Sequence, residues 1–404
     1  MSYKKNNLKN AIHGFFLSIA TTVAEPSTIM PLIVHHFTQN LIVVGLFTSL
    51  LRGGAIVIQL VAAFYAQSFE RTLKYLKIVF LFRFLAWFGI GVVIYLFGDS
   101  HPTLTLWLIG IGLFLFSFSA GFGGIYFKEI IAKVFDSTQR GRTMANRQLF
   151  SSIGAVLSGG VAGWVLSHYE APKSYSYLFL FSSILMVIGF LAFATIDEPS
   201  KQSVSKRESS FFEFLQNAYK ILKQDRALQI QIAASLLGYS FLLAMPFVII
   251  QAKESINLSG WLVGSFITIQ MIGSILGNFF LWRNFGSNYV LMLKVAFLFM
   301  ILAFLIALFF QNAYAYSVIF FLFGVGIDGF RNADMNLVIE IAPEDKRPVY
   351  VAIQSTIVSL GLFFSIPGGL ILELFGYRVL YITTILALGA GVYFTSLLKK
   401  YHPL

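Results

Sequence analysis

Apolar runs long enough to cross a lipid bilayer recur from one end of the chain to the other. A membrane helix needs about 20 such residues, because backbone amides in hydrocarbon must form their hydrogen bonds within the segment. Of the 404 residues, 57% are hydrophobic and 12% are charged, whereas a soluble domain carries about 25% charged residues. We therefore predict an all-α membrane protein with twelve transmembrane helices. The predicted spans are residues 11–37, 41–67, 73–97, 103–127, 144–168, 175–196, 227–252, 258–282, 288–310, 313–341, 348–373 and 376–398.

Several functional classes are disfavoured by what the sequence lacks. It has no Cys, so neither a disulfide nor a thiolate metal site can form. We find no Gly-rich nucleotide loop with a following Lys-Ser/Thr, no zinc motif and no nucleophile elbow. The basic N-terminal stretch leads into a run too long and too polar for a cleaved signal peptide. We therefore expect no enzyme activity, no cofactor and no bound metal.

The basic residues are distributed unevenly between the loops. With the N-terminus in the cytoplasm, most of the 29 Lys and Arg residues fall on the cytoplasmic side. The opposite side receives Lys173, Lys253 and Arg378, and three arginines lie within spans, namely Arg52, Arg83 and Arg331. This asymmetry follows the positive-inside rule and predicts cytoplasmic termini. The net charge of +11 then reflects how the chain is oriented in the membrane. We therefore expect its partner to be a lipid bilayer and not nucleic acid, and we take this bilayer to be a bacterial inner membrane.

The longest polar stretch divides the chain into halves of six spans each. It covers residues 197–226 and includes "SSFFEFLQNAYKIL", whose apolar residues have helical spacing. We predict an N-terminal bundle over 1–196, a cytoplasmic linker over 197–226 that includes a surface helix, and a C-terminal bundle over 227–404.

The two halves repeat each other at a nearly constant separation along the chain. "TTVAEPSTIMPL" in the first span aligns with "SFLLAMPFVIIQ" in the seventh. In spans two and eight, Gly45 aligns with Gly264 and Gly54 with Gly273. "SGGVAG" in span five aligns with "PGGLIL" in span eleven. The order of these matches indicates a duplicated six-helix unit.

Six plus six spans, a long central loop and parallel halves resemble the major facilitator superfamily. The loop after span four fits the family through Arg140-Gly141-Arg142, and the loop after span two retains Arg71 but has Gln67 where the family has Asp. The resemblance implies two six-helix bundles related by a pseudo-twofold axis, which move around a central site to give alternating access. It also implies a small-molecule substrate.

Two opposite charges lie at similar depth in the first two spans. Glu25 is roughly 18 Å from the outer end of span one and Arg52 roughly 16 Å from that of span two, at 1.5 Å per residue. A charge at the centre of a membrane helix costs about 2.5–3.5 kcal/mol, so we predict that the two pair. Pro26 should kink the helix beside Glu25. Glu25 either binds a proton or substrate, or serves only as the structural partner of Arg52.

Span ten carries a second cluster of charges. Asp328, Arg331 and Asp334 are spaced three residues apart, with Asp328 nearest the midplane. We assign Asp328 and Arg331 to substrate or proton contact, with an inner gate as the alternative role for Arg331, and we assign Asp334 to that gate. Asn332 is expected on the same face, and Gln354 is a further candidate for lining a cavity.

The remaining charged residues near membrane depth are assigned to structure. Arg83 in span three is expected to play a structural or snorkelling role. A cytoplasmic charge network is predicted from Lys128, Glu129, Arg140 and Arg142.

These assignments predict a secondary transporter of a small organic molecule. We expect proton coupling, because a single carboxylate among arginines suits a proton better than a sodium ion, and the Gly-rich fifth span favours export. The alternatives are a uniporter or exchanger without proton coupling, a flippase for lipids or amphiphiles, and a membrane sensor that transports nothing. We expect the chain to act as a monomer.

Overall fold

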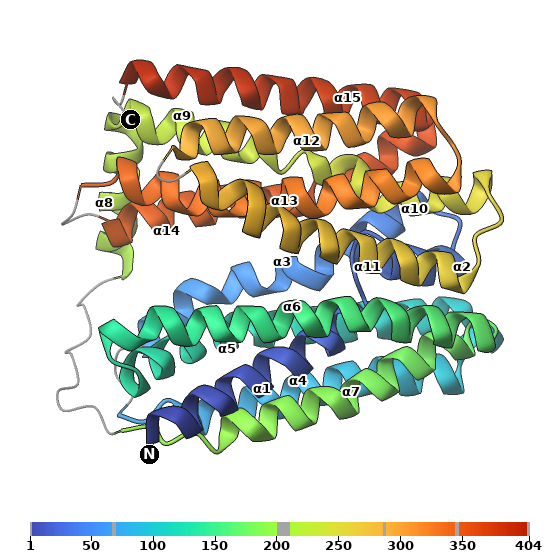
Figure 1. Cartoon of the computed structure of the whole chain (residues 1–404), viewed down its shortest axis with the longest axis horizontal. Helices are drawn as coiled ribbons and strands as arrows, with labels where there is room; N and C mark the ends of the chain where they lie inside the picture. Colours follow the sequence, from blue (N-terminus) through green and yellow to red (C-terminus); the bar gives the residue numbers. More distant parts are fainter. Residues whose placement is uncertain (1, 67–69, 200–210, 286–287, 344–346, 402–404) are drawn as a thin grey trace. The chain divides into compact units, whose positions relative to one another are not determined.

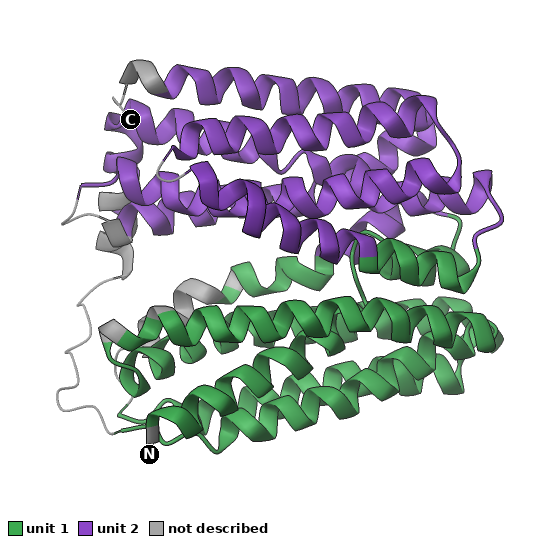
Figure 2. Cartoon of the chain, viewed as in Figure 1, with its two compact units in different colours: residues 1–39, 50–207, 259–268 green, residues 40–49, 208–258, 269–404 purple. Residues whose placement is uncertain are grey.

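The computed structural model describes residues 2–66, 70–199, 211–285, 288–343 and 347–401. Every regular element in these ranges is a helix. The helices group into two units (Figure 2). Unit 1 contains residues 1–39, 50–207 and 259–268, and unit 2 contains residues 40–49, 208–258 and 269–404. Residues 200–210 of the predicted linker and Gln67 lie outside the described residues.

Unit 1 is built from helices that run lengthwise beside one another (Figure 1). They are α1 (Ser2–Thr22), α2 (Ile29–Phe37), most of α3 (Leu41–Ala66), α4 (Leu73–Leu96), α5 (Pro102–Val134), α6 (Ser137–His168) and α7 (Lys173–Ala194). In the core of the unit, Trp87 of α4 donates a 2.9 Å hydrogen bond to Ser182 of α7. This bond joins two helices of the unit within a largely apolar core.

Unit 2 repeats this design. Its helices are α8 (Phe211–Gln224), α9 (Arg226–Gly238), α10 (Phe241–Ser255), most of α11 (Gly260–Leu276), α12 (Tyr289–Phe309), α13 (Ala313–Ile341), α14 (Arg347–Val358) and α15 (Ser365–Tyr401). Short π and 3-10 turns follow α11 at Gly277–Leu281 and Trp282–Phe285, and a 3-10 turn at Ser359–Phe363 follows α14. α15 is interrupted at Gly376, whose φ of 77° separates two helical stretches.

The observed helices correspond to the predicted spans. Nine helical stretches within the described residues are long and apolar enough to cross a membrane, and the shorter Leu41–Ile56 is also apolar. Some predicted spans are divided: the first becomes α1 and α2, the seventh α9 and α10, and the eleventh α14 with the first part of α15. α1 begins at Ser2, earlier than predicted, because the basic N-terminal residues are helical too.

Proline accounts for only some of the positions at which the helices break within the predicted spans. Residues 23–28 around Pro26 separate α1 from α2, as predicted. In the seventh span the break lies at Tyr239 and Ser240, whereas Pro246 lies inside α10. Gly361 in the unpredicted break of span eleven allows close approach, since a Cβ there would lie 2.4 Å from Cβ of Tyr239. Helix contacts, and not proline alone, therefore determine where these spans break.

The repeat seen in the sequence is also present in helix packing. In unit 1, a Cβ on Gly121 of α5 would lie 2.5 Å from the carbonyl oxygen of Ala55 in α3. In unit 2, a Cβ on Gly324 of α13 would lie 1.9 Å from the carbonyl oxygen of Gln270 in α11. Each glycine lets two backbones approach as small residues do in membrane helices. The second and fourth spans of each half thus meet in the same way.

One segment from each half of the chain groups with the unit formed by the other half, and the sequence repeat aligns these two segments with each other. Residues 40–49 of α3 group with unit 2, and residues 259–268 of α11 group with unit 1. Gly45 in the first segment packs on Ser365 of α15, and Gly264 in the second packs on Gly159 of α6. The units therefore differ from the predicted boundaries at these two segments, whose aligned glycines make equivalent contacts.

Candidate functional site

Glu25 lies in the break between α1 and α2. Its N–H donates to the carbonyl of Thr22 at 3.1 Å, and its carbonyl accepts from the N–H groups of Thr28 and Met30 at 3.1 and 3.3 Å. The hydroxyls of Thr21 and Thr22 donate to backbone carbonyls one turn earlier, at Leu17 and Ser18. Pro26 thus places a carboxyl group beside irregular backbone in a buried part of unit 1.

The predicted partner of Glu25 lies nearby. Oε1 of Glu25 is 4.0 Å from Nη2 of Arg52, and the Ser27 hydroxyl lies 3.4 Å from the same oxygen. The Glu25 side chain is 12% exposed and that of Arg52 is 34% exposed. The carboxylate is therefore largely buried, with only long contacts to these two neighbours.

A buried hydroxyl accompanies the break in each unit. Thr28 Oγ1 in unit 1 and Ser240 Oγ in unit 2 are buried and have no hydrogen-bond partner among the described residues. Buried polar groups in folded proteins are normally satisfied. The two breaks are therefore places where a water molecule or a ligand group would find a free partner.

Asp328 of α13 joins a polar cluster with the end of α11. Its Oδ2 accepts a 2.8 Å hydrogen bond from Asn278 and another from the Ser274 hydroxyl. Asn278 lies in the π turn and accepts a 2.7 Å bond from Asn332. Arg331 is 3.9 Å from Asp328. Such π turns are frequent at functional sites, and this one directs an amide toward a carboxylate.

Asp334 belongs to a different cluster. Its carboxylate accepts hydrogen bonds from Gln231 of α9 at 3.0 Å, from Gln354 of α14 at 2.8 Å and from the Ser235 hydroxyl. The residue is buried, and no basic side chain contacts it within the described part of the chain. Three neutral donors from two neighbouring helices therefore hold this carboxylate.

Helix geometry explains why the three charges of span ten separate. A helix advances 100° per residue, so residues six positions apart point about 120° away from each other. Asp328 and Arg331 are three positions apart, so their side chains point in similar directions and approach to 3.9 Å. Asp334 faces the core of unit 2, while Arg331 is exposed. Arg331 and Asp334 do not pair.

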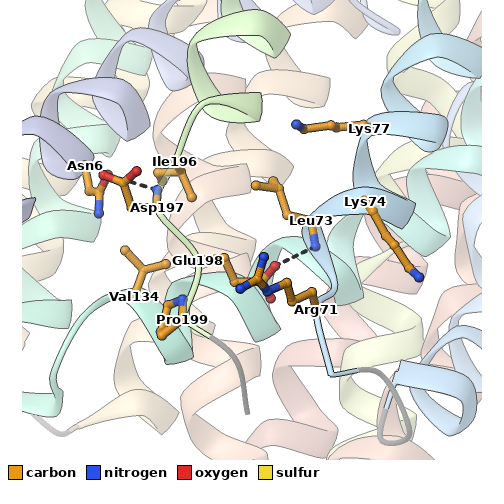
Figure 3. A pocket seen from close by; sticks show the side chains of 10 residues that line it. All are labelled: Asn6, Arg71, Leu73, Lys74, Lys77, Val134, Ile196, Asp197, Glu198 and Pro199. Atoms are coloured by element: carbon orange, nitrogen blue, oxygen red, sulfur yellow. Dashed lines mark hydrogen bonds between the residues drawn. The ribbon is translucent and has the colours of Figure 1, made fainter.

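A charge network in unit 1 involves partners that the sequence analysis missed. Lys133 Nζ is 2.9 Å from Glu198 and 3.9 Å from Glu129. Glu198 also accepts the N–H group of Leu73 at 2.8 Å, at the start of α4 (Figure 3), and that of Thr72 at 2.9 Å. The linker side of α7 is thereby attached to the first turn of α4.

The other predicted members of this network are placed differently. Arg140 donates to the carbonyls of Ala132 and Phe135 at the end of α5, where a cation complements the helix dipole. Lys128 and Arg142 are exposed. Glu129 contacts Lys133, one turn further along α5.

Arg83 lies inside unit 1 against aromatic rings. Its guanidinium carbon is 4.5 Å from the ring centre of Phe116 and 5.6 Å from that of Phe190. Close by, Arg147 contacts His13 at 2.7 Å within a group of phenylalanines. Cation–π contacts suit a desolvated guanidinium, so this geometry is consistent with a structural role.

Sequence reasoning missed four polar residues of unit 2 that contact the two aspartates. They are Gln231, Ser235, Ser274 and Asn278. Each is a polar residue within an apolar span, and this is the only feature of the sequence that could have identified it. Side chains of this kind often satisfy neighbours within a helix, so sequence alone does not select them.

Comparisons with known proteins agree with this architecture. The family model described as Major Facilitator Superfamily matches residues 11–366. The crystal structure of nucleoside transporter NupG has a TM-score of 0.72 at 15% identity, covering 98% of this chain and 100% of that one. The D-xylose-proton symporter has a TM-score of 0.73 at 15% identity, covering 100% and 98%.

A POT family transporter in complex with 5-aminolevulinic acid has a TM-score of 0.72 at 10% identity, covering 97% and 95%. No curated protein matches the chain by sequence. At these identities the structures establish the fold alone, and they confirm the predicted twelve-helix architecture. The family match covers most of the chain and confirms the resemblance seen in its motifs. The protein therefore belongs to the Major Facilitator Superfamily, whose members are secondary transporters of small molecules and not enzymes.

Proposed function

We propose that this protein couples the movement of a small organic molecule to that of protons, and that Glu25 carries the proton. The observation behind this proposal is the placement of a carboxyl group, 12% exposed, in the break between α1 and α2. Irregular backbone at membrane depth is tolerated where it is buried in protein or lines a water-filled cavity. Such a break is also where discontinuous helices of transporters bind substrates and coupling ions.

Arg52 provides the link between the proton and the substrate. While Glu25 is ionised, it attracts the guanidinium 4.0 Å away. A proton on Glu25 removes this attraction and so changes the electrostatic environment of Arg52, which is one-third exposed. The two charges therefore provide a switch that responds to protonation and that can change how a substrate is held.

Transport without proton coupling is the second candidate. The same Glu25–Arg52 contact favours it, because the carboxylate then only neutralises a partly buried arginine. We propose a single chain with both termini in the cytoplasm as the transporting unit, and export as its direction. The glycine-rich stretch of α6 is the motive for export, although Gly159 and Gly163 also serve to pack α11 within unit 1.

Transport assays distinguish the two candidates. A thermal-shift screen first selects a ligand, beginning with nucleosides, D-xylose and 5-aminolevulinic acid, which appear in the names of similar structures. Proteoliposomes then measure accumulation driven by a pH gradient and, separately, exchange at equal pH. We expect Glu25→Gln to abolish gradient-driven accumulation and to retain exchange.

The exposed Glu170 offers a matched control, since Glu170→Gln removes the same charge from the surface of unit 1. We expect this control to transport like the unmodified protein. Undiminished gradient-driven accumulation by Glu25→Gln would rule out Glu25 as the proton carrier and would favour the uniporter or exchanger.

A further inference from the structure

The middle of α13 carries a polar network whose hydrogen bonds fix the direction of the amide groups in it. Oδ2 of Asp328 accepts hydrogen bonds from the Ser274 hydroxyl and from Nδ2 of Asn278, the latter at 2.8 Å. Because Nδ2 of Asn278 faces the carboxylate, its Oδ1 faces Asn332, which donates through its own Nδ2 at 2.7 Å. Oδ1 of Asn332 is therefore left without a partner in the described part of the chain.

Trp282 holds the turn that carries Asn278 against α13. Asn278 lies in the π turn Gly277–Leu281, and Trp282 follows this turn directly. The Trp282 indole N–H donates to the carbonyl of Val325 at 3.1 Å. Its ring occupies the space of a side chain at Gly329, where a Cβ would approach it to 2.3 Å. The amide of Asn278 is therefore held on a fixed element, which suits a binding group that must be placed precisely.

The same face of α13 is open to solvent. The side chain of Arg331 is 50% exposed and that of Asp328 is 25% exposed, and their nearest charged atoms are 3.9 Å apart. Asn332 is exposed beside them. Asp328 lies near the middle of α13, where charges that face hydrocarbon are expensive. This face is therefore expected to line an aqueous path and not lipid.

The groups on this face that a ligand can reach carry no net charge. They are Oδ1 of Asp328, Oδ1 of Asn332 and the guanidinium of Arg331, so they combine two acceptors with several donors. A cation attracted by Asp328 would be repelled by Arg331, and an anion attracted by Arg331 would be repelled by Asp328. A hydroxyl group avoids both penalties, because it can donate to either oxygen and accept from the guanidinium.

We propose that this face of unit 2 binds a neutral, polyhydroxylated substrate. Its hydroxyls donate to Oδ1 of Asp328 and to Oδ1 of Asn332, and one of them accepts from Arg331. Met335, three residues beyond Asn332 and 62% exposed, offers apolar contact to the C–H face of a ring. Asn278 is a positioning residue that orients the carboxylate. This substrate class rests on the transport function proposed above and adds to it the chemistry of the transported molecule.

Thermal-shift and calorimetric titrations of the full-length protein, at one pH and without a gradient, test the substrate class. The neutral probes are D-xylose, uridine and myo-inositol, and the charged probes are choline, succinate and zwitterionic 5-aminolevulinic acid. We expect at least one neutral probe to bind more tightly than every charged probe. Binding of no neutral probe, or tightest binding of a charged one, would overturn the proposal.

Variants then test which residues hold the neutral probe. Asp328→Asn removes the anionic acceptor and should weaken its binding about tenfold or more, since hydrogen bonds to charged groups are the stronger kind. Asn332→Ala, at an exposed position, should weaken binding about fivefold. Asn284→Ala is the matched control, because it removes an exposed amide from the turn Trp282–Phe285 of the same unit. Unchanged binding by Asn332→Ala, or an equal loss in the control, would overturn the proposal.

A double-mutant cycle tests the positioning role of Asn278. Because Asn278 acts through the carboxylate, Asn278→Ala should weaken binding of the neutral probe, yet add nothing to the loss in a protein that already carries Asp328→Asn. Additive losses would show that Asn278 acts by another route and would overturn this role. No proton gradient enters these titrations, so a negative result leaves the coupling role of Glu25 unaffected, and failure of that role leaves the titrations unaffected.

Discussion

Gln354 donates a 2.8 Å hydrogen bond to Oδ2 of Asp334, while the carboxylate makes no contact with Arg331 three residues away. All three donors to Asp334 come from unit 2, on α9 and α14. The network therefore joins the elements of one unit. We therefore expect substitutions of Asp334 to lower the stability of the protein first.

We predict that Asp334→Ala destabilises the protein by about 3 kcal/mol or more, because Gln231, Ser235 and Gln354 would lose a buried acceptor. Asp334→Asn should cost about 1 kcal/mol, since its amide oxygen still accepts and a glutamine amide can turn to present its own oxygen. Thermal unfolding in detergent measures both. Glu340→Ala, on the exposed face of the same helix, should have little effect. Equal losses at the two positions would contradict the network.

The Glu25–Arg52 contact should show a modest coupling energy. The atoms are 4.0 Å apart and Arg52 is 34% exposed, so water screens the pair more than it would a fully buried ion pair. We predict about 1 kcal/mol from a double-mutant cycle of Glu25→Gln and Arg52→Gln on unfolding free energy. Strictly additive single changes would show that the two side chains act independently.

Close helix packing gives a prediction that does not depend on transport. A Cβ on Gly324 would lie 1.9 Å from the carbonyl oxygen of Gln270, so α11 and α13 must separate in Gly324→Ala. We expect a loss of about 1–3 kcal/mol in thermal unfolding. Gly389 of α15 has no atom within 4 Å of such a Cβ, and Gly389→Ala should leave stability unchanged or raise it slightly. Similar effects at both positions would contradict this account of the packing.

The helical fold could be predicted from sequence because long apolar runs have few other solutions in a bilayer. The repeat also identified Gly45 and Gly264, which make equivalent contacts in the structure. The repeat aligns Pro246 of span seven with Pro26, yet the break in span seven occurs at Tyr239, where Gly361 approaches. That contact joins residues distant in sequence, and no local pattern encodes it.

The charged residues illustrate the same limit. The similar depth of Glu25 and Arg52 was enough to predict their contact, because two adjacent spans leave each charge little choice of partner. In span ten, spacing suggested one stripe, yet Asp334 faces α9 and α14 while Asp328 faces α11. Which neighbour lies on each face depends on helix packing, so Asn278 and Gln231 could not be paired with the aspartates beforehand.

The contact of Glu198 with α4 gives the last prediction. Its carboxylate caps the helix through the N–H groups of Thr72 and Leu73, and it pairs with Lys133, whose side chain is 10% exposed. Glu198→Ala removes the cap and leaves the lysine without its closest anion, so we expect a loss of about 3 kcal/mol. Hydrogen exchange should quicken first at the start of α4. Asp197→Ala, one residue away and exposed, is the control and should change neither measurement. If the first turn of α4 exchanges at the same rate in both variants, Glu198 does not secure the linker to this helix.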